Sequence, residues 1–162
     1  MNIGEYGLLL GLTALIWAPI IIKNGSALMI ERFLKNIKIA VIDDERMLLS
    51  VLSSLMRQSH YDAEFFSNPL KAYEVIERHP DLYQLLILDI RMPKMDGITF
   101  AKMIREKCPD LPILFMTADP SDEVRERAES LGRVAFLEKP FPLEQTLKEV
   151  IPKFLGPAPE NV

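Results

Sequence analysis

Cysteine is almost absent from this sequence, because Cys108 is the only one in 162 residues. One thiol cannot form an internal disulfide, which excludes a disulfide-stabilised scaffold and is consistent with a reducing cytoplasm. Histidine occurs twice, and His60 and His79 both fall at predicted helix ends, so neither is expected to act in catalysis. No basic stretch stands out, and the net charge is -4. Direct binding to nucleic acid is therefore not expected.

Long apolar runs are also lacking, except near the N-terminus. Residues 7–22 read GLLLGLTALIWAPIII and carry no charge. As a helix this run reaches roughly 24 Å, which is short of a typical hydrocarbon core of about 30 Å. No Lys or Arg precedes it and no small-residue cleavage site follows, so it does not resemble a secretory signal.

Three interpretations of residues 1–28 stay open. The segment is a short membrane anchor, an apolar helix packed on the domain or a partner, or a non-native extension ahead of a start at Met29. If residues 7–22 insert, the Lys and Arg residues that follow place the remainder in the cytoplasm, tethered to the inner face of the membrane.

The rest of the chain has the composition of one globular domain, with 49% hydrophobic and 26% charged residues overall. From residue 37 onward, short β-branched apolar runs alternate with stretches of helical periodicity, which places Met47, Val51 and Leu55 on one helix. Strands are expected at 37–42, 63–66, 85–89, 112–117 and 134–137, and helices at 45–58, 68–78, 97–108, 121–131 and 143–154. This alternation predicts an α/β fold with a doubly wound, five-stranded parallel sheet and five helices. Residues 155–162 are expected to form a flexible tail.

Polar residues follow four of the predicted strands, where the ligand site of such a sheet lies. They are Asp43 and Asp44, Asp89, Thr117, and Lys139. Three carboxylates brought together repel each other unless a cation neutralises them, and hard oxygen ligands suit Mg²⁺. A carboxylate can act as a nucleophile and form an aspartyl-phosphate, while an ammonium and a hydroxyl can bind phosphoryl oxygens. The set predicts reversible phosphorylation of one Asp.

Four motifs carry a family resemblance: VIDDE at 41–45, LDIRMPKMDG at 88–97, MTA at 116–118 and EKPF at 138–141. In this order and spacing they resemble the receiver domain of two-component response regulators, over residues 37–154. Each motif alone is a weak signal, but four in register on predicted strand ends are strong. The resemblance implies a flavodoxin-like sheet of order 2-1-3-4-5, as in single-domain chemotaxis receivers.

The resemblance also implies roles at the strand ends. Asp89 matches the phosphoacceptor, and Asp43 and Asp44 match the acidic pair, with Asp44 a direct metal ligand. The Mg²⁺ ligands would be Asp43, Asp44, Asp89 and the backbone carbonyl of Arg91.

Thr117 and Lys139 match the residues that bind the phosphoryl group, and the Lys139–Pro140 bond is expected to be cis. Phe136 matches the switch aromatic of the family. On phosphorylation Thr117 would move toward the phosphoryl group and Phe136 would swing inward. The face formed by helix 121–131, strand 134–137 and helix 143–154 would then change shape and signal to an output protein.

Arg91 and Asp119 are expected to flank the phosphoryl group with opposite charges. We hypothesise that this pair restricts the attacking water and slows loss of the phosphoryl group.

The leading hypothesis is a stand-alone receiver, phosphorylated by a histidine kinase or phosphotransfer protein, with no attached output domain. It is not expected to be an enzyme beyond self-phosphorylation from small phosphodonors and autodephosphorylation. A phosphorylation-independent interaction module is disfavoured because the acids and the lysine are all present. A phosphotransferase or phosphatase acting in trans is disfavoured because no Asp-x-Asp follows from Asp89 and no cap domain is evident.

Overall fold

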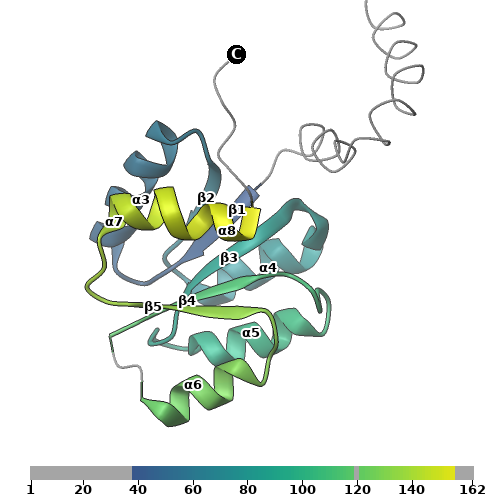
Figure 1. Ribbon diagram of the computed structural model, residues 1–162. Helices are drawn as coiled ribbons and strands as arrows, with labels where there is room; N and C mark the ends of the chain where they lie inside the picture. Colours follow the sequence, from purple (N-terminus) through teal and green to yellow (C-terminus); the bar gives the residue numbers. More distant parts are fainter. Residues whose placement is uncertain (1–37, 119–120, 156–162) are drawn as a thin grey trace, which may run out of the picture. The chain divides into compact units, whose positions relative to one another are not determined.

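The computed structural model describes residues 38–118 and 121–155, and these form a five-stranded sheet with helices on both faces (Figure 1). The strands are β1 (Lys38–Ile42), β2 (Asp62–Phe66), β3 (Tyr83–Asp89), β4 (Ile113–Thr117) and β5 (Val134–Glu138). Their order is β2-β1-β3-β4-β5, and every neighbouring pair is parallel. The predicted flavodoxin-like sheet is confirmed.

Helices connect the strands as the alternating pattern predicted. They are α3 (Arg46–Gln58), α4 (Pro69–Arg78), α5 (Gly97–Arg105), α6 (Asp122–Glu129) and a last helical segment made of α7 (Leu143–Gln145), η2 (Thr146–Val150) and α8 (Ile151–Leu155). A short 3₁₀ turn, η1 (Pro80–Leu82), precedes β3. At the start of α4, Asn68 accepts a hydrogen bond from the Leu70 N–H at 3.1 Å and Pro69 occupies the first position, as expected.

Two apolar layers hold the helices to the sheet. On one face, α3 and the last helical segment pack on side chains such as Ile39, Val41 and Met116. On the other face, α4, α5 and α6 pack on Ile42, Phe115 and their neighbours (Figure 1). Because the central strands β1, β3 and β4 are buried on both faces, their sequences are almost continuously apolar.

The apolar side of α3 is narrower than its sequence suggests. Leu49, Leu52 and Met56 are buried, but Met47 is 79% exposed and Val51 is 46% exposed. Met47 and Val51 lie four residues apart, so they share a stripe of the helix that faces away from the sheet.

The last helical segment is interrupted where a regular α-helix was predicted over 143–154. Residues Thr146–Val150 adopt a π-helical turn. Pro152 explains the turn, because a proline ring inside an α-helix collides with the carbonyl four residues earlier and lacks an N–H donor. The wider π turn accommodates this defect and lets the segment continue into α8.

The predicted N-terminal apolar helix, the 1–28 segment and the 155–162 tail lie outside the described residues, apart from Leu155 at the end of α8. Within residues 38–118 and 121–155, no helix is both long and apolar enough to cross a membrane.

A polar cluster joins three strands on the α4 side of the sheet. The Tyr83 hydroxyl donates a hydrogen bond to Glu64 Oε2 at 2.8 Å, and Lys38 Nζ lies 3.0 Å from the same oxygen. Burial on its own raises the pKa of Glu64, but the hydrogen bonds from Lys38 and Tyr83 outweigh it and hold this pKa below its ordinary value. The cluster therefore stabilises the ionised carboxylate.

This cluster predicts an acid-sensitive contribution to stability. A carboxyl whose pKa is lower in the folded state stabilises the fold above its unfolded pKa of about 4.3, and this contribution is lost as the pH falls through the folded pKa. Glu64→Gln is expected to lower the free energy of unfolding by about 0.5–1 kcal/mol near pH 7. The value is modest because the side chains of Lys38 and Glu64 are each about one-third exposed. Urea unfolding across a pH series measures the difference, which should shrink toward zero as the pH falls below about 4. An undiminished difference in acid would mean that the ion pair is not its source.

Candidate functional site

Lys139 joins two buried carboxylates at the carboxyl edge of the sheet. Its Nζ lies 2.7 Å from Asp43 Oδ2 and 2.7 Å from Asp89 Oδ1. Asp43 directly follows β1, Asp89 ends β3, and Lys139 directly follows β5. The structure thus brings together three of the predicted site residues, which are up to 96 positions apart in the chain.

Burial dominates the electrostatics of this group. Asp43 is 1% exposed and Asp89 is 5% exposed. Burial raises the pKa of Asp89, and the nearby charge of Asp43 adds to the increase, while the hydrogen bond from Lys139 opposes it; the net direction is upward. Burial on its own lowers the pKa of Lys139, but the hydrogen bonds to Asp43 and Asp89 outweigh it and raise this pKa. Lys139 is therefore held in its charged form.

Backbone contacts fix the position of each group. Asp43 Oδ1 accepts a hydrogen bond from the Glu45 N–H at 2.8 Å, so this carboxylate is oriented by the turn that leads into α3. The Lys139 N–H donates to the Thr117 carbonyl at 2.7 Å, which ties the end of β5 to the end of β4. The Lys139–Pro140 peptide is cis, as predicted.

A glycine allows the loop after β3 to fold back against Asp89. The Gly97 N–H donates to the Ile90 carbonyl at 2.9 Å. A Cβ atom at Gly97 would collide with the Asp89 carbonyl oxygen and lie 3.0 Å from Ile90 Cα. Asp96 begins α5 beside it and accepts hydrogen bonds from the Thr99 N–H at 3.0 Å and the Thr99 hydroxyl at 2.7 Å.

The donor set fits a divalent cation by charge and by ligand type. One ammonium neutralises only one of the two buried carboxylates, and Asp44 adds another acid next to Asp43 in the sequence. Carboxylate oxygens are the hard ligands that Mg²⁺ prefers. Asp44 is exposed, however, and within residues 38–118 and 121–155 no three Asp, Glu, His or Cys side chains already lie in a metal-holding group. Of the predicted Mg²⁺ ligands, Asp43 and Asp89 therefore share the Lys139 ammonium, and Asp44 is exposed.

The predicted switch residues lie on neighbouring strands. Thr117 ends β4 and is 1% exposed. Two residues earlier, Phe115 pairs in register with Phe136 of β5, and their rings stack with centroids 5.9 Å apart and an interplanar angle of 27°. Phe136 is half-buried, and the Arg125 guanidinium of α6 lies 5.0 Å from its ring centroid. Of the other expected pair, Asp119 lies outside the described residues.

Sequence reasoning missed Arg105, which connects α5 to the loop between α6 and β5. Its guanidinium donates to the carbonyls of Leu131 at 2.8 Å and Gly132 at 2.7 Å, and also to those of Cys108 and Leu111. An Arg near a helix end is a common solvated residue, so only the fold shows that Arg105 holds the carboxyl end of α6.

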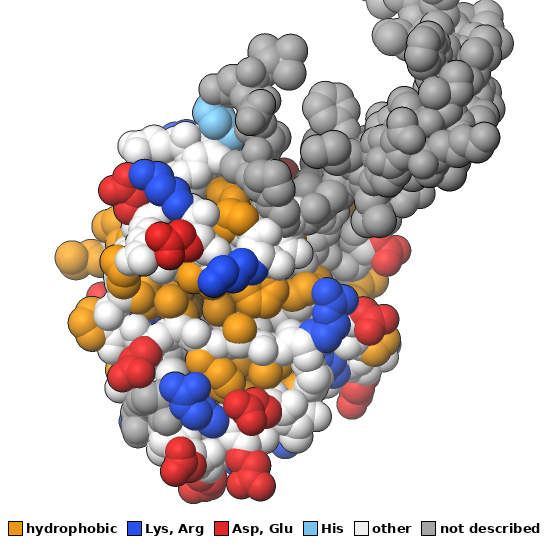
Figure 2. Space-filling model, in the orientation of Figure 1, with side chains coloured by type: hydrophobic (Ala, Val, Ile, Leu, Met, Phe, Trp, Pro, Cys, Tyr) orange, Lys and Arg blue, Asp and Glu red, His pale blue; other side chains and the backbone are white. Residues whose placement is uncertain are grey.

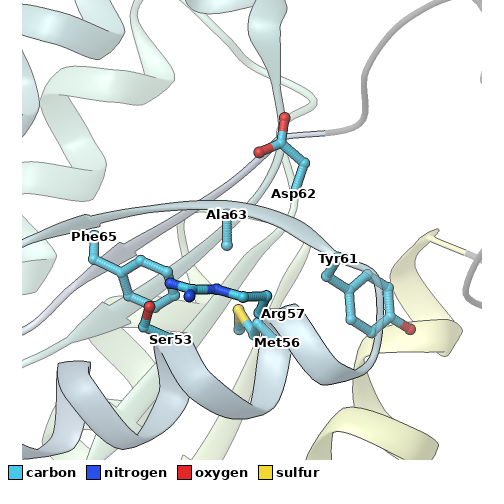
Figure 3. A pocket seen from close by; sticks show the side chains of 7 residues that line it. All are labelled: Ser53, Met56, Arg57, Tyr61, Asp62, Ala63 and Phe65. Atoms are coloured by element: carbon cyan, nitrogen blue, oxygen red, sulfur yellow. The ribbon is translucent and has the colours of Figure 1, made fainter.

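A cavity of about 230 Å³ lies elsewhere, between α3 and β2 (Figure 3). Its lining comprises Ser53, Met56, Arg57, Tyr61, Asp62, Ala63 and Phe65. None of the predicted site residues is among them. In Figure 3 Tyr61 and Phe65 lie at opposite ends of this lining, with Arg57 between them.

Comparison with known proteins identifies the class. The family model described as response regulator receiver domain matches residues 39–151. The chain therefore belongs to the response regulator receiver domain family, a family of signalling domains. It is 34% identical to the response regulator MprA of Mycobacterium leprae over 115 residues, which cover 70% of this chain and 49% of MprA. The chain spans about half the length of the MprA relatives that it matches.

Solved structures agree with this assignment. The non-phosphorylated HemR receiver domain of Leptospira biflexa is 28% identical with a TM-score of 0.68, covering 78% of this chain and 99% of that domain. The chemotaxis protein CheY4 of Vibrio cholerae is 25% identical with a TM-score of 0.66, covering 73% of this chain and 98% of CheY4. The described residues thus form a complete receiver fold.

The close approach at Gly97 predicts a specific defect. Gly97→Ala is expected to lower the free energy of unfolding by about 1–3 kcal/mol, because the new methyl group overpacks against the backbone of Asp89 and Ile90. Displacement of Asp89 from Lys139 should also slow the phosphorylation that the sequence predicts for Asp89. Urea unfolding and intact mass after treatment with acetyl phosphate and Mg²⁺ measure the two effects.

Gly132 provides the matched control. It has a φ of +65°, and a Cβ there meets no atom within 4 Å. Gly132→Ala is expected to cost about 1 kcal/mol through backbone strain alone, with unchanged phosphorylation. Equal phosphorylation rates in the two variants would show that the approach of Gly97 to Asp89 has no bearing on the site.

Proposed function

We propose that this domain accepts a phosphoryl group on Asp89 from a histidine kinase or phosphotransfer protein and passes the signal to another protein by a change of shape. The observation that carries the proposal is the Lys139 ammonium 2.7 Å from both buried carboxylates. A buried acid–base group at strand ends, on a sheet of this topology, is where chemistry is expected.

The proposed transfer needs little covalent chemistry from the protein. A carboxylate oxygen of Asp89 attacks the phosphorus atom, the P–N bond to the donor histidine breaks, and its electron pair stays on the imidazole. Lys139 donates hydrogen bonds to a phosphoryl oxygen, and the Thr117 hydroxyl donates to another. Asp43 keeps Lys139 in its charged form and in position. Hydrolysis of the aspartyl-phosphate releases inorganic phosphate and returns Asp89 to its unphosphorylated form.

Mg²⁺ would be held by Asp43, Asp44, Asp89 and the backbone carbonyl of Arg91. When bound, it neutralises the excess of acids and stabilises the charge on the transferring group. The CheY protein of Borrelia burgdorferi has a related fold, and its crystal structure was solved as a complex with CheX, BeF₃ and Mg²⁺. That protein is 22% identical to this chain, so the likeness supports the fold, and the Mg²⁺ requirement here rests on the donor set.

The proposed output face comprises α6, β5 and the α7–α8 segment. Hydrophobic side chains gather along β5 and between β5 and its neighbouring helices (Figure 2). The apolar β5 residues Val134 to Leu137 are all half-buried, unlike those of the central strands. An apolar edge strand flanked by two helices suits a protein partner rather than nucleic acid.

The donor proteins of such systems act inside the cell, so the expected location is the cytoplasm. We also propose, on the sequence alone, that residues 7–22 tether the domain to the inner face of the membrane.

Phosphorylation provides the direct test. The full chain, incubated with Mg²⁺ and acetyl phosphate, should gain one phosphoryl group by intact mass, and chelation of Mg²⁺ should abolish the gain. Asp89→Asn should gain none. It should still fold, because an amide there removes the repulsion between two buried carboxylates that share one ammonium.

Lys139→Met tests the proposed role of the Lys139 ammonium in binding the phosphoryl group. It should bind no phosphoryl oxygen and lose about 10²-fold or more in phosphorylation rate, as expected for removal of a preorganised donor. Absence of any phosphoryl gain in folded wild-type protein with Mg²⁺ would contradict the proposal and favour a phosphorylation-independent interaction module.

A further inference from the structure

Arg125 covers the aromatic ring that is expected to move. Its guanidinium carbon lies 5.0 Å from the centroid of Phe136, within the range of a cation–π interaction. Phe136 also stacks with the fully buried ring of Phe115. Phe136 thus contacts both a core aromatic ring of β4 and a cation of α6.

The helix that carries Arg125 has few apolar anchors. Ala128 is the only buried residue of α6, and Val124 and Leu131 are partly buried against the core. At its carboxyl end, the Arg105 guanidinium binds the carbonyls of Leu131 and Gly132. The carboxyl end of α6 is therefore fixed, and Arg125 adds a contact between the body of the helix and Phe136 of β5.

We propose that Arg125 is a positioning residue that holds Phe136 in its resting, half-exposed position and so opposes the switch to the active arrangement. The inference rests on the proposed function. An inward swing of Phe136 separates the ring from the guanidinium, so the active arrangement loses the interaction. Phosphorylation must overcome this loss, and Arg125 thereby sets how readily the domain activates.

The same contact couples the switch to the output face. Arg125 belongs to α6 and Phe136 to β5, and both elements form that face. When Phe136 swings inward, its ring loses the contact with Arg125 while Arg105 still holds the carboxyl end of α6. The loss of this contact changes the face at α6 and at β5 together.

Variants at Arg125 test the inference in the full chain. Arg125→Met keeps most of the length of the side chain but removes the charge. This variant should be phosphorylated about two- to fivefold faster than wild type by acetyl phosphate with Mg²⁺. Arg125→Ala also uncovers the ring and should be at least as fast, whereas Arg125→Lys keeps a cation and should lie closer to wild type. NMR of labelled phenylalanine gives a second readout. In unphosphorylated Arg125→Met, the Phe136 ring signals should shift toward those of wild type bound to beryllofluoride and Mg²⁺.

Two controls separate this contact from general effects. Arg127→Met removes the same charge from an exposed position of the same helix, so any change that it shares with Arg125→Met is an effect of charge alone. In a Phe136→Leu background there is no ring, so Arg125→Met should leave the rate unchanged.

The outcomes discriminate between the proposals. An unchanged rate and unchanged ring signals in folded Arg125→Met, or an equal acceleration in the Phe136→Leu background, would overturn the role of Arg125 while leaving phosphorylation of Asp89 intact. If wild type gains no phosphoryl group at all, the proposed function fails and the role of Arg125 fails with it.

Discussion

The bridge from Lys139 to the buried carboxylates of Asp43 and Asp89 constrains the rest of this domain. These groups follow β1, β3 and β5, so the ammonium reaches its partners only if the strands are parallel and end at the same edge of the sheet. The arrangement is costly, since one cation compensates two buried acids and burial raises the pKa of Asp89. The apolar layers on both faces of the sheet must supply the stability that this edge lacks. The unbalanced negative charge of this site is the feature on which the proposed binding of Mg²⁺ rests.

The parallel sheet and the bridged residues could be predicted from the alternation of apolar runs and from the polar residues at the strand ends, whereas the order of the strands was predicted from the resemblance to receiver domains. An apolar run such as LLIL before Asp89 is typical of a strand that is buried on both faces of a sheet, and an acid at the end of such a run requires a partner. The strand ends then place Asp43, Asp89 and Lys139 at one edge. Element boundaries were predicted less well: β3 begins two residues earlier than expected, at Tyr83, which pairs with Lys38 of β1 across a register shift that no residue pattern reveals.

Other features depend on contacts that the sequence does not encode locally. Pro152 lies in a stretch of helical periodicity, and its conversion of the preceding turn to a π-helix results from the competition between proline geometry and burial of Ile151 and Leu155 on the sheet. Met47 and Val51 fit the helical pattern of α3 yet face solvent, since periodicity gives the spacing of apolar residues and not the width of the buried stripe. Arg105 and Arg125 resemble any solvated arginine until the fold shows their carbonyl and ring partners.

The short path between the site and the output face follows from strand geometry. Side chains alternate along a strand, so Thr117 and Phe115 lie on the same side of β4, the side covered by α5 and α6. Phe115 pairs with Phe136, and three residues beyond Phe136 the Lys139 N–H binds the Thr117 carbonyl. Thr117, Phe136 and Lys139 are therefore linked through two adjacent strands. The proposed movement of Thr117 toward a phosphoryl group on Asp89 would therefore be transmitted within β4 and its neighbour β5, the strand that carries the ring beside Arg125.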